Sequence, residues 1–236
     1  MFKRLLVLTL GCMTLIGVRT FSAQSDEAER VQKAATVLEQ IMSVPDKAIP
    51  TPVIKKAEAI AVFPGTIKGG LGIGAHRGKG ILSVRNREAG KWSNPAFLTL
   101  TGGSFGAQIG AEEIDLVLVV MNRAGLENLL KDEFKIGADA SVAAGPVGRS
   151  AEASTDAVAK AEILSYSRAR GLFAGVSLAG TAIRADGDAN QAYYGRALST
   201  REIVRPGEVV VGTAGAKPKA PAGVAVWHRT LDKYTK

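Results

Sequence analysis

The spacing of apolar residues divides the chain into a helical beginning and a long stretch of strands. Over Ser25–Met42 apolar residues recur every three or four positions, which predicts an amphipathic helix with one buried face. Asp26 and Glu29 stand at the spacing of a capping box at its start. A short second helix is expected over Thr51–Glu58, with Thr51 as its cap and Pro52 at its first helical position.

From Ala59 onward the apolar period changes to two, the period of a strand. Six strands are expected in the first half of the chain, at Ala59–Phe63, Leu71–Ala75, Gly80–Arg85, Ala96–Thr101, Phe105–Ala111 and Ile114–Met121. The polar segment His76–Lys79 is interpreted as a turn between the second strand and the third.

The second half of the chain mixes short helices with strands. Helices are expected at Asn122–Leu130, with Asn122 as cap, and at Ala189–Tyr194 and Ser199–Val204. Strands are expected at Ile136–Ala144, Ile163–Ser167 and Leu172–Ile183. This order predicts a single α+β domain with a curved, largely antiparallel sheet or partial barrel and flanking short helices.

The two ends of the chain differ in character from the middle. Residues 1–22 resemble a signal peptide, because Lys3 and Arg4 precede the apolar stretch Leu5–Val18 and small residues precede a cleavage point after Ser22. Lipid attachment at Cys12 is the less favoured alternative. The chain is therefore expected to be exported, to the periplasm or a membrane face.

The C-terminal region is interpreted as separate from the domain. We expect the domain to occupy residues 23–205, followed by a linker and tail over residues 206–236. Within the tail, Val224–Tyr234 is either a closing helix or a loose end.

Composition and charge limit the classes of partner and site that the chain can have. The 46% of hydrophobic residues suffices for a full core, and the formal net charge of +8 becomes 8 − 3 = +5 when the three cations of residues 1–22 are removed. Such a basic protein is drawn to anionic surfaces. With 6% aromatic residues no stacking platform for nucleic acid is expected. Two histidines and one cysteine cannot form a familiar zinc set. No cofactor and no metal are expected.

Two short motifs point to chemistry that their surroundings do not support. Gly70–Ala75 matches a relaxed dinucleotide-binding pattern, but a further strand, not a helix, is expected after it. Gly102-x-Ser104-x-Gly106 matches a nucleophile elbow, with His228 late enough to be the base. A serine hydrolase using Ser104 is kept as the second alternative function.

Cations gather near the glycine-rich segments and are the best functional signal. Arginine and lysine bind phosphate together with backbone N–H groups, which glycine-rich loops can offer. The candidate headgroup-binding set is Lys55, Lys56, Lys68, Arg77, Lys79, Arg149, Arg168 and Arg170. For Arg149 and Arg168 a structural role, helix capping or pairing with Asp156 or Glu162, is the alternative.

The glycine-rich phrases themselves identify a family. In chain order they are Phe63–Gly65, Lys68–Gly74, Gly102–Gly110, Ala144–Ser150 and Tyr166–Gly175. Over Val31–Val204 the chain resembles the SYLF family, also called Ysc84-like. The resemblance implies association with lipids and phosphoinositides, so we expect a non-enzymatic protein that binds anionic phospholipid at the periplasmic membrane face.

Two other functions compete with lipid binding. A structural or envelope interaction protein without lipid specificity is the first alternative, and no protein partner can be named for it. Eukaryotic relatives are also associated with actin, but an exported chain would not meet it. Because no SH3 module is recognisable beside the domain, a cytoskeletal adaptor is not expected.

Overall fold

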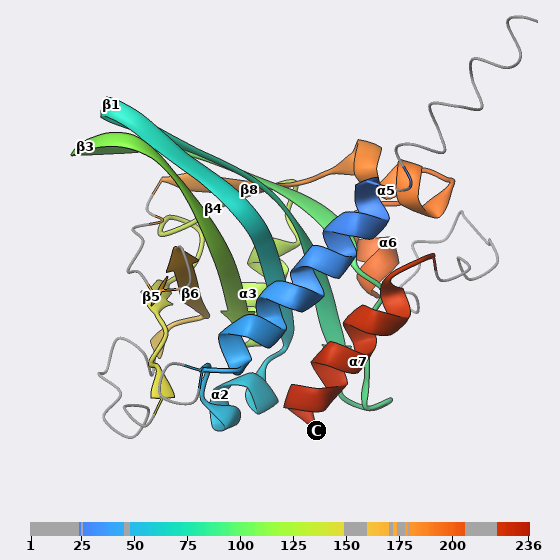
Figure 1. The fold of residues 1–236 in the computed structure, drawn as a ribbon. Helices are drawn as coiled ribbons and strands as arrows, with labels where there is room; N and C mark the ends of the chain where they lie inside the picture. The colour runs from blue at the N-terminus through green and yellow to red at the C-terminus, as the bar shows by residue number, and fades with distance from the viewer. Residues whose placement is uncertain are drawn as a thin grey trace, which may run out of the picture.

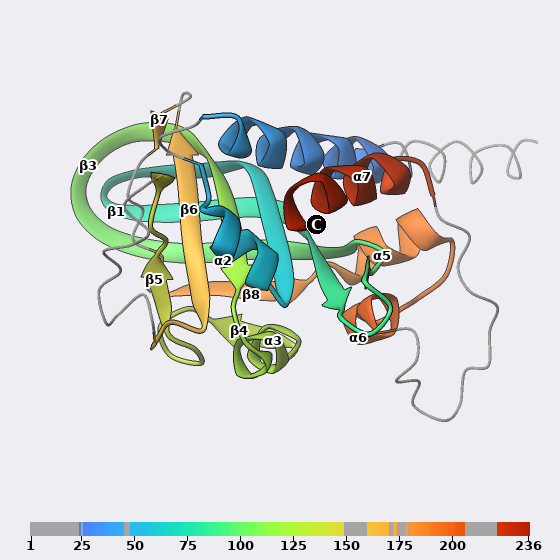
Figure 2. The ribbon, with the colours of Figure 1, turned by 90° about the horizontal axis from the view of Figure 1, so that it is seen from below.

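A long two-stranded ribbon of β1 (Ala59–Asn86) and β3 (Ala96–Val120) dominates the structure, and both strands bend back on themselves (Figures 1 and 2). The computed structural model describes residues 24, 26–44, 48–148, 160–169, 172–173, 178, 180–205 and 221–236, with the backbone alone for 70–74, 104–111 and 172–173. The two strands pair antiparallel from Ala59↔Val120 to Leu82↔Ala96, with register shifts after Phe63 and after Leu71. The bend lies in the glycine-rich middle of both strands.

The ribbon is the centre of a strongly curled, half-barrel sheet of eight strands. The other strands are β2 (Lys91–Trp92), β4 (Glu133–Lys135), β5 (Val142–Ala144), β6 (Ile163–Ala169), β7 (Leu172–Phe173) and β8 (Thr181–Ala185). β6 pairs with the second half of β3, and β8 pairs with its first half and with β4. Among the described strands only β5 and β6 pair in parallel, so the sheet is mixed but largely antiparallel. The predicted α+β class and partial barrel are confirmed.

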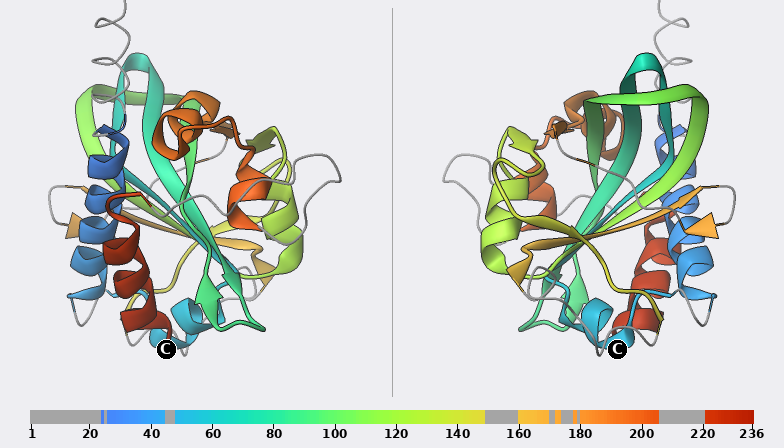
Figure 3. Two further views of the ribbon diagram at one scale, coloured as in Figure 1. Left: turned by 90° about the vertical axis from the view of Figure 1, so that its right-hand side faces the viewer. Right: turned by 90° about the vertical axis from the view of Figure 1, so that its left-hand side faces the viewer.

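Helices cover both faces of this sheet (Figure 3). One face carries the helix at 26–42, and beside it α7 (Val224–Thr235). The other carries α3 (Arg123–Leu129) and α6 (Thr200–Val204). The remaining helices are α2 (Thr51–Lys56), which contacts α7, and α5 (Gly187–Tyr194), which contacts β3. Among the described residues no helix is long and apolar enough to cross a membrane.

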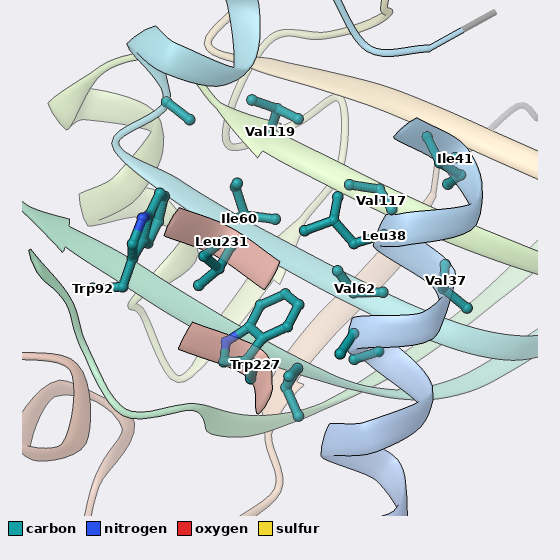
Figure 4. Close-up of a cluster of buried hydrophobic side chains, with 14 of the residues drawn as sticks. Val37, Leu38, Ile41, Ile60, Val62, Trp92, Val117, Val119, Trp227 and Leu231 are labelled. Atoms are coloured by element: carbon teal, nitrogen blue, oxygen red, sulfur yellow. The ribbon is translucent and has the colours of Figure 1, made fainter. Parts of the chain in front are cut away.

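The first core cluster lies between the ribbon and the helix at 26–42 together with α7 (Figure 4). Leu38, from the predicted apolar helix face, meets Val62 of β1 and Val117 of β3 there. Trp227 of α7 is fully buried, and its indole N–H donates to Ser83 Oγ at 2.8 Å. Of the two alternatives for the C-terminal segment, the closing helix is the one observed.

The second core cluster lies on the other face. Alternate residues of the same strands, such as Phe63, Leu82 and Leu116, pack there with Leu126 of α3 and Ile203 of α6. Because neighbouring strand residues point to opposite faces, the same strand segments build both clusters.

Several predicted boundaries are wrong. The separate strands expected between Ala59 and Arg85 are one strand, and His76–Lys79 belongs to it instead of forming a turn. His76 and Gly78 are buried while Arg77 and Lys79 are exposed, so this segment obeys strand alternation. A segment of polar residues and glycine has the composition of a turn, but here His76 and Gly78 face the interior of a strand pair.

The later elements differ in similar ways. β4 and β5 with an isolated bridge between Ile136 and Ala140 replace the predicted strand Ile136–Ala144, and β7 and β8 replace Leu172–Ile183. The N-cap of α2 is Pro50, one residue before the predicted cap. Asn122 does cap α3, accepting from the Gly125 N–H at 2.8 Å. The predicted signal peptide lies outside the described residues.

The bend brings the two halves of β1 into backbone contact at Gly80. A methyl group on Gly80 would lie 2.4 Å from the Val62 carbonyl oxygen and 2.5 Å from the Phe63 ring. A backbone oxygen inside a paired strand cannot move aside cheaply. We therefore expect Gly80→Ala to lower the free energy of unfolding by roughly 1–3 kcal/mol in urea denaturation.

Gly187→Ala is the matched control, because a methyl group there meets nothing within 4 Å. Its free energy of unfolding should stay within about 0.5 kcal/mol of wild type. Equal effects of both substitutions would show that the close approach at Gly80 is not a constraint.

Candidate cationic site on the sheet

Arg77 and Lys79 lie together on an exposed part of the sheet, on the same side as the helix at 26–42. Along β1 they alternate with the buried His76 and Gly78. Ile81, the next residue on the same face after Lys79, belongs to the first core cluster. No acidic side chain of the described residues lies within 4.0 Å of either cation. Alternate residues of a strand stand about 6.6 Å apart, so the two charges can act on one phosphorylated group.

The pairing of four strands extends this face. One row across the sheet contains Lys79, Thr99, Arg184 and Glu133, and the next contains Arg77, Thr101, Ala182 and Lys135. Arg184 forms an ion pair with Glu133, which also lies 3.5 Å from the Lys135 ammonium. We call these eight positions the outer cationic face. Four cations against one carboxylate leave it with a net charge of +3.

Arg184 and Lys135 were missed in the sequence. The predicted strand Leu172–Ile183 ended one residue before Arg184, and Lys135 stood before the predicted start of the next strand. A period-two pattern over Thr181–Ala185 could have placed Arg184 outward, because Thr181 and Ile183 are buried. Its position beside Thr99 depends on strand pairing, which the local pattern does not contain.

A buried charge cluster borders the outer cationic face near Lys79. Arg30 of the helix at 26–42 pairs with Glu27 at 2.9 Å and with Asp186 at 3.2 Å, and stacks over the Phe97 ring. Burial raises the pKa of Glu27, against the lowering effects of Arg30 and Lys79. The cluster anchors the N-terminal part of this helix to the sheet.

The structure separates the other predicted cations from this face. Lys55 and Lys56 are exposed in the last turn of α2, whose backbone carbonyls accept hydrogen bonds from Arg85 and Arg87. Arg85 is eight positions along β1 from Arg77, about 26 Å at the rise of a strand. These two lysines therefore form a second, distant basic site.

Arg168 has internal partners in the structure. Its guanidinium lies 2.8 Å from Asp115 Oδ2 and also donates to Gln40, while the Gly65 N–H donates to Asp115 Oδ1 at 3.1 Å. It thus ties β6 to β3 and to the helix at 26–42. Arg168 therefore has the kind of structural role that was expected as the alternative, with Asp115 and Gln40 as its partners in place of Glu162. Asp156 lies outside the described residues. Arg149 and Arg170 lie outside the described residues.

Lys68 belongs to the opposite, inner side of the bend, close to His76. His76 is only 4% exposed, and neither of its ring nitrogens has a hydrogen-bond partner in the described part of the chain. A methyl group on Gly102 would lie 2.7 Å from the His76 ring and 2.8 Å from Thr181 Oγ1, which is also buried and unpartnered. Burial, with the nearby Lys68 charge, lowers the pKa of His76.

The surroundings of Ser104 do not fit a nucleophile elbow. That motif needs a sharp turn from a strand into a helix. Ser104 instead lies within β3, paired with Gly74, and β3 continues to Val120. His228, the proposed base, is on α7 and bonds the Ser93 carbonyl at 2.9 Å. The hydrolase alternative therefore lacks its structural basis.

Comparison with known proteins agrees with the glycine-rich phrases. A family model named Ysc84, described as Las17-binding protein actin regulator, matches residues 101–234. The human SH3 domain-containing YSC84-like protein 1 is 31% identical over 217 residues, 89% of this chain and 60% of that protein. LAS seventeen-binding protein 3 from Saccharomyces cerevisiae is 30% identical over 79% of this chain and 40% of that protein. The chain thus spans about half the length of these relatives.

His76 makes stability depend on pH. Because the folded state binds the His76 proton more weakly than the unfolded chain, whose histidines titrate near pH 6.5, this residue lowers stability in acid. We expect its contribution to the free energy of unfolding to fall as the pH drops below about 6.5, and to level off once the folded-state pKa is passed.

Urea denaturation at pH 7.5 and at pH 5.5 measures this loss, which should be smaller in His76→Gln than in wild type. Lys68→Met should also reduce it, because it removes the charge that disfavours the protonated ring. An identical pH-dependent loss in all three proteins would contradict the assignment.

Proposed function

The chain belongs to the Ysc84 family, and we propose that it is a non-enzymatic module that binds anionic phospholipid at a membrane face. The observation that carries the proposal is the outer cationic face, where Arg77 and Lys79 are exposed without an acidic partner among the described residues. The paired strand fixes the backbone that carries these charges, so binding costs side-chain freedom alone. Each cation near an anionic bilayer adds on the order of 1 kcal/mol of binding free energy.

The neighbouring side chains support recognition of phosphate. Arg77 offers a planar set of N–H donors that matches phosphate oxygens, and Lys79 offers a compact ammonium charge. The Thr101 hydroxyl lies in the row of Arg77 and can donate a further hydrogen bond, while the Thr99 hydroxyl, in the row of Lys79, donates to the Arg184 carbonyl oxygen at 3.5 Å. Arg184 is half-exposed, so its guanidinium can exchange Glu133 for a lipid phosphate.

A protein partner is the second candidate function. The description of the matching family names Las17 binding and actin regulation. An acidic protein surface could meet the same cations, because charge attraction alone does not distinguish it from a bilayer. The envelope interaction protein without lipid specificity, named above as an alternative, is one form of this candidate.

Replacing Arg77 and Lys79 together by glutamine should weaken binding to vesicles of phosphatidylcholine and phosphatidylglycerol. The expected loss is about 2 kcal/mol, or roughly thirtyfold in the partition coefficient, measured by co-sedimentation at low salt. The wild-type protein should also leave the vesicles as salt rises, because exposed charges are screened.

Lys55→Gln with Lys56→Gln is the matched control, since it removes the same charge at the distant basic site. This variant should bind within about threefold of wild type at the same salt. Equal losses in both double variants would show that net charge alone drives binding. Failure of the wild-type protein to pellet with anionic vesicles, with retention on filamentous actin or another acidic protein, would favour the second candidate.

We further propose that the protein is exported and loses residues 1–22. Intact mass spectrometry of the protein from its native host should give a chain that begins at Ala23. A mass that includes a diacylglycerol on Cys12 would instead show lipoprotein processing.

A further inference from the structure

Two buried polar side chains on the inner side of the bend have no hydrogen-bond partner. His76 is 4% exposed and Thr181 is fully buried. Neither ring nitrogen of His76 and no bond of the Thr181 hydroxyl is satisfied within the described part of the chain. Buried polar atoms are almost always paired in folded proteins, because an unpaired one loses its hydration without a compensating bond. Two such groups in one place indicate that a bound molecule supplies their partner.

The two side chains flank Gly102 in one row of the sheet. Gly102 of β3 is opposite His76 of β1 on one side and opposite Thr181 of β8 on the other. A methyl carbon on Gly102 would lie 3.0 Å from His76 Nε2 and 2.8 Å from Thr181 Oγ1, so both polar atoms border the same position. A hydrogen bond spans about 2.7–3.2 Å, so one oxygen-bearing group can reach both atoms.

Glycine positions connect this pair of side chains with the surface. Gly102 is half-buried, and Gly103 and Gly180 are exposed. A methyl group on Gly180 would meet only the Gly103 carbonyl oxygen among the described residues, at 3.9 Å. The His76–Thr181 pair is therefore bordered by bare backbone on the side of Gly180, where a small molecule can approach.

The charge beside this pair is positive. Burial and then the Lys68 ammonium lower the pKa of His76, so its ring is neutral at pH 7.5. Glu112 stands opposite Lys68 in the register of β1 and β3, but no ion pair within 4.0 Å joins these two described residues. A neutral imidazole donates from one nitrogen, and the threonine hydroxyl donates as well. Two donors beside an ammonium suit an oxygen that carries negative charge.

We propose that His76 and Thr181 bind one phosphate group, as free phosphate or as a phosphate monoester, with Lys68 providing the opposite charge. The phosphate oxygens accept the hydrogen bonds for which the two buried groups have no protein acceptor. Strand alternation puts this site on the side of β1 opposite to Arg77 and Lys79. The site is therefore separate from the outer cationic face and does not rest on the proposed function.

The chain has two histidines, which makes the proposal measurable by NMR of their rings. At pH 7.5 added sodium phosphate should shift the ring signals of His76 until they saturate, and should raise its pKa, because a bound anion stabilises the protonated ring. His228 is the internal reference, since it lies on α7 and bonds the Ser93 carbonyl oxygen. Sodium chloride at the same ionic strength should move neither histidine.

Thr181→Val removes the hydroxyl at nearly unchanged shape. The dissociation constant for phosphate should rise roughly ten- to hundredfold, as expected for one hydrogen bond to a charged group. Without phosphate this variant should be at least as stable as wild type, because it removes a buried hydroxyl that has no partner. Lower stability would show that the hydroxyl is bonded within the fold, which would contradict the site.

Two further variants control for indirect effects. Lys68→Met should also weaken phosphate binding, because it removes the charge beside His76. Thr200→Val is the matched control: the Thr200 hydroxyl of α6 is likewise buried and without a hydrogen-bond partner in the described chain. It should bind phosphate within about threefold of wild type. Equal losses in Thr181→Val and Thr200→Val would show that no hydroxyl contacts the ion.

The source of the phosphate group is decided by a second probe, dihexanoyl phosphatidic acid below its micelle concentration. A saturable His76 shift with inorganic phosphate supports a site for the free ion, and a shift with the short-chain lipid alone supports a lipid monoester. If neither probe moves His76, the proposal is wrong. If phosphate binding is lost in Arg77→Gln with Lys79→Gln but not in Thr181→Val, the ion lies on the outer cationic face, so this proposal is wrong while headgroup binding stands.

Discussion

The close approach of the two halves of β1 is the constraint on which the structure depends. At Gly80 the strand passes so near to Val62 that any side chain would collide with a backbone oxygen, and at Gly78 it would collide with Thr66. Backbone atoms of a paired strand cannot rotate away as a side chain can. The close approach at Gly80 therefore requires glycine, and the bend places both halves of each strand between the same two layers of helices.

Strand alternation through this bend sorts adjacent polar residues into opposite environments. His76 is buried without a hydrogen-bond partner among the described residues, and burial lowers its pKa, whereas the next residue, Arg77, is exposed to solvent. The inner side thus holds the buried His76 and Thr181 close to the half-buried Lys68, and the outer side holds the four cations of the outer cationic face. A fully buried cation would lose its hydration, so these four cations stand at solvent-accessible positions of β1, β8 and β4.

Membership of the Ysc84 family does not by itself identify a binding residue. Arg168 lies in one of the glycine-rich phrases that indicate the family, yet it joins β6 to Asp115 and to the helix at 26–42. Arg184 lies outside these phrases and nevertheless shares a row with Lys79. The relatives are longer proteins that share this unit, so the exposed surface of each chain must be considered separately from the residues that maintain the fold.

The sequence by itself determined the family, the α+β class, the buried face of the helix at 26–42 and the cap of α3, because each depends on local spacing or on residue type. It did not determine that His76–Lys79 is part of a strand, since a polar segment with glycine has the composition of a turn. Only the tertiary structure decided which cations lie together. Arg77 and Lys135 share a row across three strand pairings, whereas Lys55 contacts Arg85, eight positions from Arg77 along β1. Contacts between distant segments depend on how the sheet curls, which local sequence does not contain.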